Sequence, residues 1–200
     1  MRVGYFAAVA ITVLAGCGGS GDDGAVAPPD LDGPDATFSQ IRSDFSEKIA
    51  LYEPMAPTTL SEMPTFGSAT YTGSAVYSDR TTDPLAVQAN PTRASRMQLT
   101  ANFSAADVNG RLYNFRAANP ATVIAGELAL TGIISGNTFQ GGAFGAPGGV
   151  SGTLVTNGVA ETHGGGFAGN FTGNDHEAVT GVVVHGTPTA TFSGILVGER

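Results

Sequence analysis

Hydrophobic and polar positions alternate with a period of two along most of the chain after residue 67. The clearest case is the run 97–104, which reads Met-Gln-Leu-Thr-Ala-Asn-Phe-Ser. Such alternation is typical of an antiparallel strand with one buried face. Together with the turn residues between them, these patterns predict strands at 69–78, 97–104, 108–115, 122–132, from 136 onward, 162–173, 177–186 and 189–198. The run 150–156 either continues the strand that begins at 136 or forms one of its own.

Consecutive strands with short turns and no helices between them indicate an all-β fold, either an up-and-down barrel or a sandwich. We expect an eight-stranded antiparallel up-and-down β-barrel, because closure removes the exposed edges that a glycine-rich sheet would otherwise offer for aggregation. The last forty residues, 161–200, fit this architecture, since aromatic side chains recur among glycines there and the turn 173–177 separates two strands.

The segment before the predicted barrel has a different spacing of hydrophobic residues. Apolar residues recur at spacings of three and four between residues 38 and 52, which predicts one short amphipathic helix. Thr37 followed three residues later by Gln40 forms a capping-box pattern at its start, and Pro54 and Pro57 end it. We expect the helix to cap one end of the sheet structure, and a Pro-rich connector to lead into the barrel.

Charge is sparse and uneven. Only 13% of the 200 residues are charged and the formal net charge is −8, which argues against a nucleic-acid partner. Nine acidic residues lie between positions 22 and 62, whereas positions 67–127 hold five arginines against four acids. An acidic, solvated segment followed by a near-neutral domain is the plain interpretation. We expect a single domain and a monomer.

The N-terminal residues have the pattern of an export signal. A basic start, Met1-Arg2, is followed by an apolar run at 3–14 that is too short for a permanent transmembrane helix. The run ends in Leu14-Ala15-Gly16-Cys17, which resembles the bacterial lipobox. That resemblance implies cleavage before Cys17 and attachment of diacylglycerol and palmitate-type acyl chains to it in a Gram-negative cell, which anchors the mature protein stably. Residue 18 is Gly rather than Asp, which by the same resemblance favours the outer membrane.

These observations divide the chain into four parts. Residues 1–16 are expected to be a lipoprotein signal peptide and 17–35 a disordered, lipid-anchored tether rich in Gly, Ser, Asp, Ala and Pro. Residues 36–66 would hold the helix and the connector. Residues 67–200 would form the barrel.

Few residues suggest chemistry. The three histidines, His163, His176 and His185, are too widely spaced for a short metal-binding motif, and no Cys remains to join them. His176 is expected in a solvated turn, whereas His163 and His185 can become neighbours across strands. Tyrosine can ligate haem iron, so the three histidines and three tyrosines are candidate ligand-binding residues. The tyrosines in this set are Tyr71, Tyr77 and Tyr113. Packing in the barrel wall is the simpler interpretation of each, and we predict neither a metal nor a resident cofactor.

Catalytic signatures are lacking in the sequence. Gly164 to Gly169 satisfies Gly-x-Gly-x-x-Gly, but dinucleotide binding requires a helix after the motif and here the pattern predicts a strand. No Gly-x-Ser-x-Gly elbow occurs. The sequence therefore predicts a protein that is not an enzyme.

Several segments together resemble the β-barrel domain of transferrin-binding protein B. They are Ser-Ala-Thr-Tyr-Thr-Gly at 68–73, Leu-Thr-Ala-Asn-Phe at 99–103, Val-Asn-Gly-Arg-Leu at 108–112, Ile-Ser-Gly-Asn-Thr-Phe at 134–139, the glycine-rich hairpin 166–181 and the final Phe-Ser-Gly at 192–194. Factor H binding protein and the haemophilins are similar in this module. The resemblance covers about residues 66–200 and implies an eight-stranded barrel on a lipidated tether. Receptor members of the family carry two lobes, whereas this sequence predicts one barrel, so no receptor contact is carried over to a residue here.

Three functional hypotheses follow. The favoured one is a non-enzymatic lipoprotein on the outer surface of the outer membrane that binds a host or extracellular protein, or an iron- or haem-type solute. The second is a structural or scaffold lipoprotein on the periplasmic face with no small ligand. The third, a transmembrane barrel, is disfavoured because a lipobox already supplies an anchor and the strands carry too few aromatic residues for two girdles.

Overall fold

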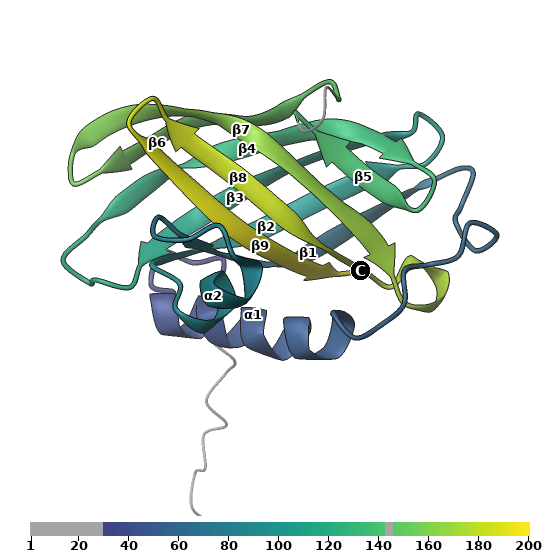
Figure 1. Ribbon diagram of the computed structural model, residues 1–200, viewed down its shortest axis with the longest axis horizontal. Helices are drawn as coiled ribbons and strands as arrows, with labels where there is room; N and C mark the ends of the chain where they lie inside the picture. Colours follow the sequence, from purple (N-terminus) through teal and green to yellow (C-terminus); the bar gives the residue numbers. More distant parts are fainter. Residues whose placement is uncertain (1–29, 143–145) are drawn as a thin grey trace, which may run out of the picture.

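A computed structural model describes residues 30–142 and 146–200 (Figure 1). Two helices, α1 and α2, and nine strands follow one another along the chain, with a single 3₁₀ turn at Asn174–His176. The elements are α1 Phe38–Tyr52, β1 Ser68–Ser78, α2 Pro84–Ala89, β2 Arg93–Asn102, β3 Asp107–Ala117, β4 Ile124–Ser135, β5 Thr138–Gly141, β6 Gly149–Thr156, β7 Val159–Thr172, β8 Ala178–Thr187 and β9 Ala190–Glu199.

The strands close into an antiparallel barrel. Except for β5 and β6, each strand pairs with its neighbours in sequence, and β9 pairs back onto β1 through the register Ala75↔Leu196. β5 and β6 share one position, because both lie between β4 and β7, with Ile133↔Gln140 on one side of the interruption and Thr131↔Gly149 on the other. The barrel therefore has eight strand positions, and the predicted fold class is confirmed. The run 150–156 lies at the same barrel position as the strand that begins near residue 136, since β5 ends at Gly141 and β6 begins at Gly149 between the same two neighbours.

Inward-facing side chains fill the barrel, because successive residues of a strand point to opposite faces. The largest of them are almost wholly shielded from solvent: Tyr71, Tyr77, Phe115, Phe139, Phe167, Phe171, Met97, Leu99, Leu112 and Leu128. Inward-facing glycines make room for this aromatic core. A Cβ on Gly169 would collide with the ring of Phe139, and one on Gly194 with the ring of Tyr77. Glycines and rings thus complement each other across the interior.

Helix α1 lies along the outside of the barrel rather than across one end (Figure 1). Its buried residues Ile41, Phe45, Ile49 and Tyr52 form a second apolar cluster with outward-facing side chains of β1, β2, β8 and β9. The capping box predicted at its start is present, since Thr37 and Gln40 bond each other's backbone. The helix was expected at an end of the sheet, and that expectation was wrong because its apolar stripe matches the apolar outer face of β1 and β9.

Two features were not anticipated. Residues 84–89 lie between two predicted strands, where no helix was expected, but they form the short helix α2, with Asp83 as its N-cap and Pro84 in its first turn. The structure also places contacts at residues 30–35, inside the range predicted as tether, where Asn114 donates to the carbonyl oxygens of Leu31 and Gly33. The predicted signal peptide, Cys17 and residues 18–29 of the predicted tether lie outside the described residues. Within residues 30–142 and 146–200, neither helix is long and apolar enough to cross a membrane.

Candidate functional site

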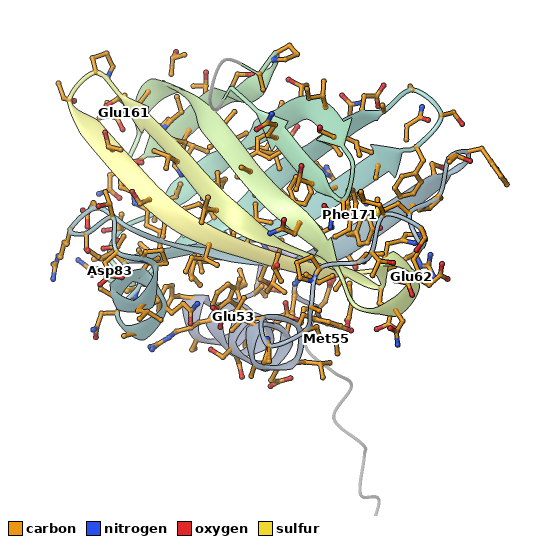
Figure 2. All side chains as sticks on the ribbon, turned by 45° about the vertical axis from the view of Figure 1, so that its right-hand side comes forward. Glu53, Met55, Glu62, Asp83, Glu161 and Phe171 are labelled. Carbon is orange, nitrogen blue, oxygen red and sulfur yellow. The ribbon has the colours of Figure 1, made fainter. Side chains whose placement is uncertain are left out.

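The six candidate residues lie in three separate places. His163, His185 and Tyr77 meet inside the barrel at the end formed by the β6–β7 and β8–β9 hairpins, which we call the β6–β7 end. Tyr71 and His176 meet at the opposite end, and Tyr113 lies on the outside. In Figure 2, the labelled Glu161 marks the β6–β7 end of the barrel, and the labelled Phe171 lies toward the opposite end. The candidates therefore do not converge on one ligand-sized site.

The histidine pair at the β6–β7 end confirms the expected neighbours across strands. His163 on β7 and His185 on β8 both face inward and are 2% and 1% exposed. Their Nδ1 atoms lie 3.1 Å apart, so one imidazole donates to the other. At least one ring must then be neutral at Nδ1, because two protonated Nδ1 atoms cannot share this contact.

Aromatic rings and one arginine surround the pair. The Phe192 ring stacks on His185 with centroids 5.3 Å apart, and the edge of His185 meets Tyr77. Arg93 lies at the start of β2, and its guanidinium carbon is 4.0 Å from the centroid of the Phe192 ring. Both histidine rings contact that same ring. The site is thus an apolar pocket of rings with two imidazoles and one cation in it.

Several buried polar atoms at this end lack hydrogen-bond partners among the described residues. They are Nε2 of His163, Nε2 of His185, Nη1 of Arg93 and Oγ1 of Thr156. A buried polar group without a partner loses its hydration and gains nothing in return, which disfavours the folded state. The opposite end holds two further atoms of this kind, on Thr172 and His176.

The electrostatics follow from burial. Burial, together with the neighbouring His163 and the charge of Arg93, lowers the pKa of His185 to about 3. Burial also lowers the pKa of His163, an effect that Arg93 reinforces and Glu161 opposes. Both imidazoles are therefore neutral at physiological pH. Burial lowers the pKa of Arg93 as well, although a guanidinium remains charged.

The other end of the interior is held by ordinary hydrogen bonds. The Tyr71 hydroxyl donates to the backbone carbonyl of His176 over 3.1 Å. Arg200 lies 2.7 Å from Nε2 of His176, which makes that nitrogen the acceptor and the ring neutral. His176 was expected in solvent, but it is 5% exposed because its ring packs against Phe103 and the turn folds back over the barrel end. This end is a closed cap.

Tyr113 belongs to a polar cluster on the outer wall that we call the outer clamp, formed by Asp32, Asp44, Ser74, Arg96 and Tyr113. Arg96 lies 3.0 Å from Asp32 and 2.7 Å from Asp44, and Tyr113 donates to Asp32 over 2.7 Å. Burial works to raise the pKa of Asp44, but bonds from Lys48 and Ser74 and the charge of Arg96 hold it below its ordinary value. The clamp joins the segment before α1 and α1 itself to β1, β2 and β3.

The chemistry available to these residues is limited. Burial raises the pKa of Tyr71 and of Tyr77, and burial together with Asp32 raises that of Tyr113 to about 12, so all three phenols stay protonated and are poor iron ligands. In the part of the chain that the structure describes, no three His, Cys, Asp or Glu side chains gather as a metal site requires. What the β6–β7 end offers is hydrogen-bond donors and one positive charge.

Arg93 is the functional candidate that sequence reasoning missed. The predicted strand began at residue 97, whereas β2 begins at Arg93 and pairs Tyr77↔Arg93. Extending the alternation back from Met97 would have placed Arg93 on the inward face. An arginine at an inward position of a barrel strand was the signal that could have identified it.

Comparisons with known proteins agree with this architecture. The family described as the C-lobe and N-lobe beta barrels of Tf-binding protein B matches residues 63–199. Intact Ap-TbpB, with its N and C lobes, is 16% identical at a TM-score of 0.45, with 72% of this chain and 28% of that chain covered. A mutant TbpB of Haemophilus parasuis Hp5 is 15% identical at a TM-score of 0.46, with the same coverage of 72% and 28%.

The N-lobe domain of lactoferrin binding protein B of Moraxella bovis is also similar. It is 15% identical at a TM-score of 0.36, with 68% of this chain and 60% of that domain covered. This chain therefore spans less than two thirds of the length of each of these proteins. The comparison with curated proteins gave no match.

Proposed function

The chain belongs to the family of β-barrels that form the C-lobe and N-lobe of Tf-binding protein B, and from that membership we propose a non-enzymatic outer-membrane lipoprotein that binds a host or extracellular protein at the cell surface. The similar proteins are named for binding transferrin or lactoferrin. Which protein this chain binds is left to experiment, because it spans only a part of their length.

The filled interior is the observation that carries the choice of a protein partner. Large aromatic and aliphatic side chains occupy the middle of the barrel, so a large solute would have to displace the core that holds the fold together. The candidate haem ligands are also split between two ends and the outer wall. Both facts favour a partner that contacts the loops and the outer wall over an iron- or haem-type solute held inside.

The outer wall formed by β7 and β8 suits such a partner. Its outward side chains are small or apolar, with Val182 and Val184 exposed by 45% and 43%. Between Leu128 and Gly198 the sequence carries only three charged residues, Glu161, Asp175 and Glu177. Uncharged surface with exposed aliphatic groups is typical of the centre of a protein interface. The apolar interior and the helix-covered outer wall also favour a water-soluble barrel over a membrane-spanning one.

The anchor is proposed from the sequence. Cys17 would carry the lipid, and the tether would hold the barrel away from the membrane. Protease treatment of intact cells tests the location: a surface lipoprotein is degraded, and Cys17→Ala should release it from the membrane fraction. Protection in intact cells with degradation after permeabilisation would contradict surface exposure and support the periplasmic scaffold.

A haemin titration tests the choice of partner class. The full chain in detergent should give no saturable Soret shift, since the three histidines, Tyr71 and Tyr77 are buried in the barrel and the Tyr113 hydroxyl is bound to Asp32. A saturable shift at one equivalent would overturn the preference for a protein partner. His185→Leu and Tyr113→Phe would then show whether the interior or the outer wall holds the haem.

A further inference from the structure

A surface hollow opens beside Arg93 at the β6–β7 end of the barrel. It has a volume of about 230 Å³ and lies between the end of β1, the start of β2 and the end of β3. Its lining residues are Asp79, Arg80, Thr92, Arg93, Ala117, Ala118, Asn119 and Thr122. The hollow therefore combines polar side chains, two arginines and a small apolar wall.

Arg93 is the unusual member of this lining. It is half-buried, forms neither a hydrogen bond nor an ion pair with any described residue, and its Nη1 is shielded from solvent. The ring of Phe192 lies 4.0 Å from the guanidinium carbon and fixes where the group can sit. A fixed, partly desolvated cation that lacks a counterion is unfavourable unless a ligand supplies one.

The nearest carboxylates do not act as a counterion for Arg93. Asp79 lies on the same lining, but it accepts from the Thr92 hydroxyl over 3.3 Å and lies 4.0 Å from Arg80 instead. The charges of Asp79 and of Glu161 on β7 both act to raise the pKa of Arg93, yet neither carboxylate forms an ion pair with it among the described residues. None of the N–H donors of the Arg93 guanidinium forms a hydrogen bond with a described residue, and the buried Nη1 is therefore without a partner there.

We propose that this hollow binds a small carboxylate, with Arg93 as its anchoring residue. A guanidinium presents a planar fork that matches a carboxylate bidentately. Ala117 and Ala118 give a short carbon chain an apolar surface, and the hydroxyl groups of Thr92 and Thr122 give neutral donors. Arg80, whose side chain is 84% exposed, lies at the edge, where it attracts anions without holding them. The site goes beyond the proposed partner protein and does not depend on it.

Calorimetric titration of the full chain in detergent tests the site, with acetate, succinate, citrate and inorganic phosphate as separate probes at constant ionic strength. We expect saturable binding of at least one carboxylate, more tightly than phosphate. Arg93→Met should weaken it by about tenfold or more, since a charge-assisted bidentate bond is worth roughly 1.5–3 kcal/mol. Arg93→Lys keeps the charge without the fork and should give an intermediate affinity.

Arg80→Met is the matched control, because it removes a second arginine from the same lining. It should change the affinity by less than about threefold, as expected for an exposed charge. Glu161→Gln should tighten binding, because it removes an acid that competes for Arg93. Absence of saturable binding by all four probes, tighter binding of phosphate than of every carboxylate, or equal affinity in folded Arg93→Met and wild type would overturn the proposal.

Discussion

Arg93 and Arg96 stand three positions apart on β2 and point to opposite faces of the barrel wall. Arg96 faces outward into the outer clamp, where Asp44 and Asp32 lie 2.7 and 3.0 Å away. Arg93 faces inward over Phe192 and has no carboxylate in contact among the described residues. One strand thus carries a fully paired guanidinium and an unpaired one.

The difference distinguishes an arginine that stabilises the fold from one that can serve a ligand. A buried charge with a partner stabilises the arrangement that holds both, and removing the partner is severely destabilising. A half-buried charge without a counterion, such as that of Arg93, is unfavourable by itself, so its presence is consistent with a ligand-binding role. The outer clamp fixes α1 to the barrel, whereas the β6–β7 end keeps a cation and two neutral imidazoles available.

Breaking the clamp should have the largest effect on stability. Arg96→Met removes the guanidinium that pairs with both Asp44 and Asp32, and it leaves Asp44, whose side chain is 14% exposed, with Lys48 as its remaining counterion. We expect a loss of about 3 kcal/mol. For a domain of this size that corresponds to a fall in Tm of roughly 6–12 °C. Urea unfolding followed by circular dichroism measures it. A loss below about 1 kcal/mol would show that the clamp is not structural.

The second-largest effect on stability is expected from acid, which should destabilise the β6–β7 end. The folded-state pKa of His185 is about 3, well below its ordinary value of 6.5, so the folded chain binds fewer protons than the unfolded chain. Stability is complete above pH 6.5 and is lost as the pH falls from 6.5 toward 3, by roughly 2–4 kcal/mol. The lowered pKa of Asp44 contributes only below its ordinary value of 3.8.

Replacing the pair identifies the source of this acid sensitivity. The double variant His163→Leu/His185→Leu should have a flatter stability profile between pH 6.5 and 4.5, because only His176 then titrates from a lowered pKa there. Unfolding at several pH values measures the slope. An unchanged slope in the folded double variant would assign the acid sensitivity elsewhere.

The exposed part of the clamp should matter least. Tyr113→Phe removes the hydroxyl that donates to Asp32, a carboxylate with 60% of its side chain exposed, and we expect a loss below about 1 kcal/mol. The pKa of Asp32 should rise toward its ordinary value, since this bond helps to lower it. Carboxyl NMR chemical shifts against pH would detect that rise, and an unaltered pKa would contradict the bond.

Much of the fold was predictable because period-two alternation is a local signal. The strand of residues 97–104 and the helix with its Thr37–Gln40 capping box could both be identified without the structure. The shared position of β5 and β6 could not, because it depends on pairing with β4 and β7 across the barrel. Helix α2 carried a local signal, the Asp83 cap followed by Pro84, that a loop interpretation overlooked.

The candidate site was predictable only in part. His163 and His185 could be expected as neighbours because the adjacent strands β7 and β8 place His185 opposite Gly165, two residues from His163 and on the same face. The burial of His176 depends on how its turn folds over Phe103, which lies in the turn after β2 and is distant in the sequence. The lack of a counterion at Arg93 is likewise a property of the closed barrel, because it depends on the positions of Asp79 and Glu161, neither of which contacts it.

One paired measurement tests the contrast between the two arginines most directly: thermal unfolding of the wild type, Arg93→Met and Arg96→Met, each with and without a saturating carboxylate. We predict that Arg96→Met unfolds at a lower temperature yet keeps the stabilisation by the ligand. Arg93→Met should keep the wild-type Tm, or exceed it, and lose that stabilisation. If both variants lost stability equally, or if Arg93→Met retained the full ligand-induced shift, the separation between a structural and a ligand-binding arginine would be contradicted.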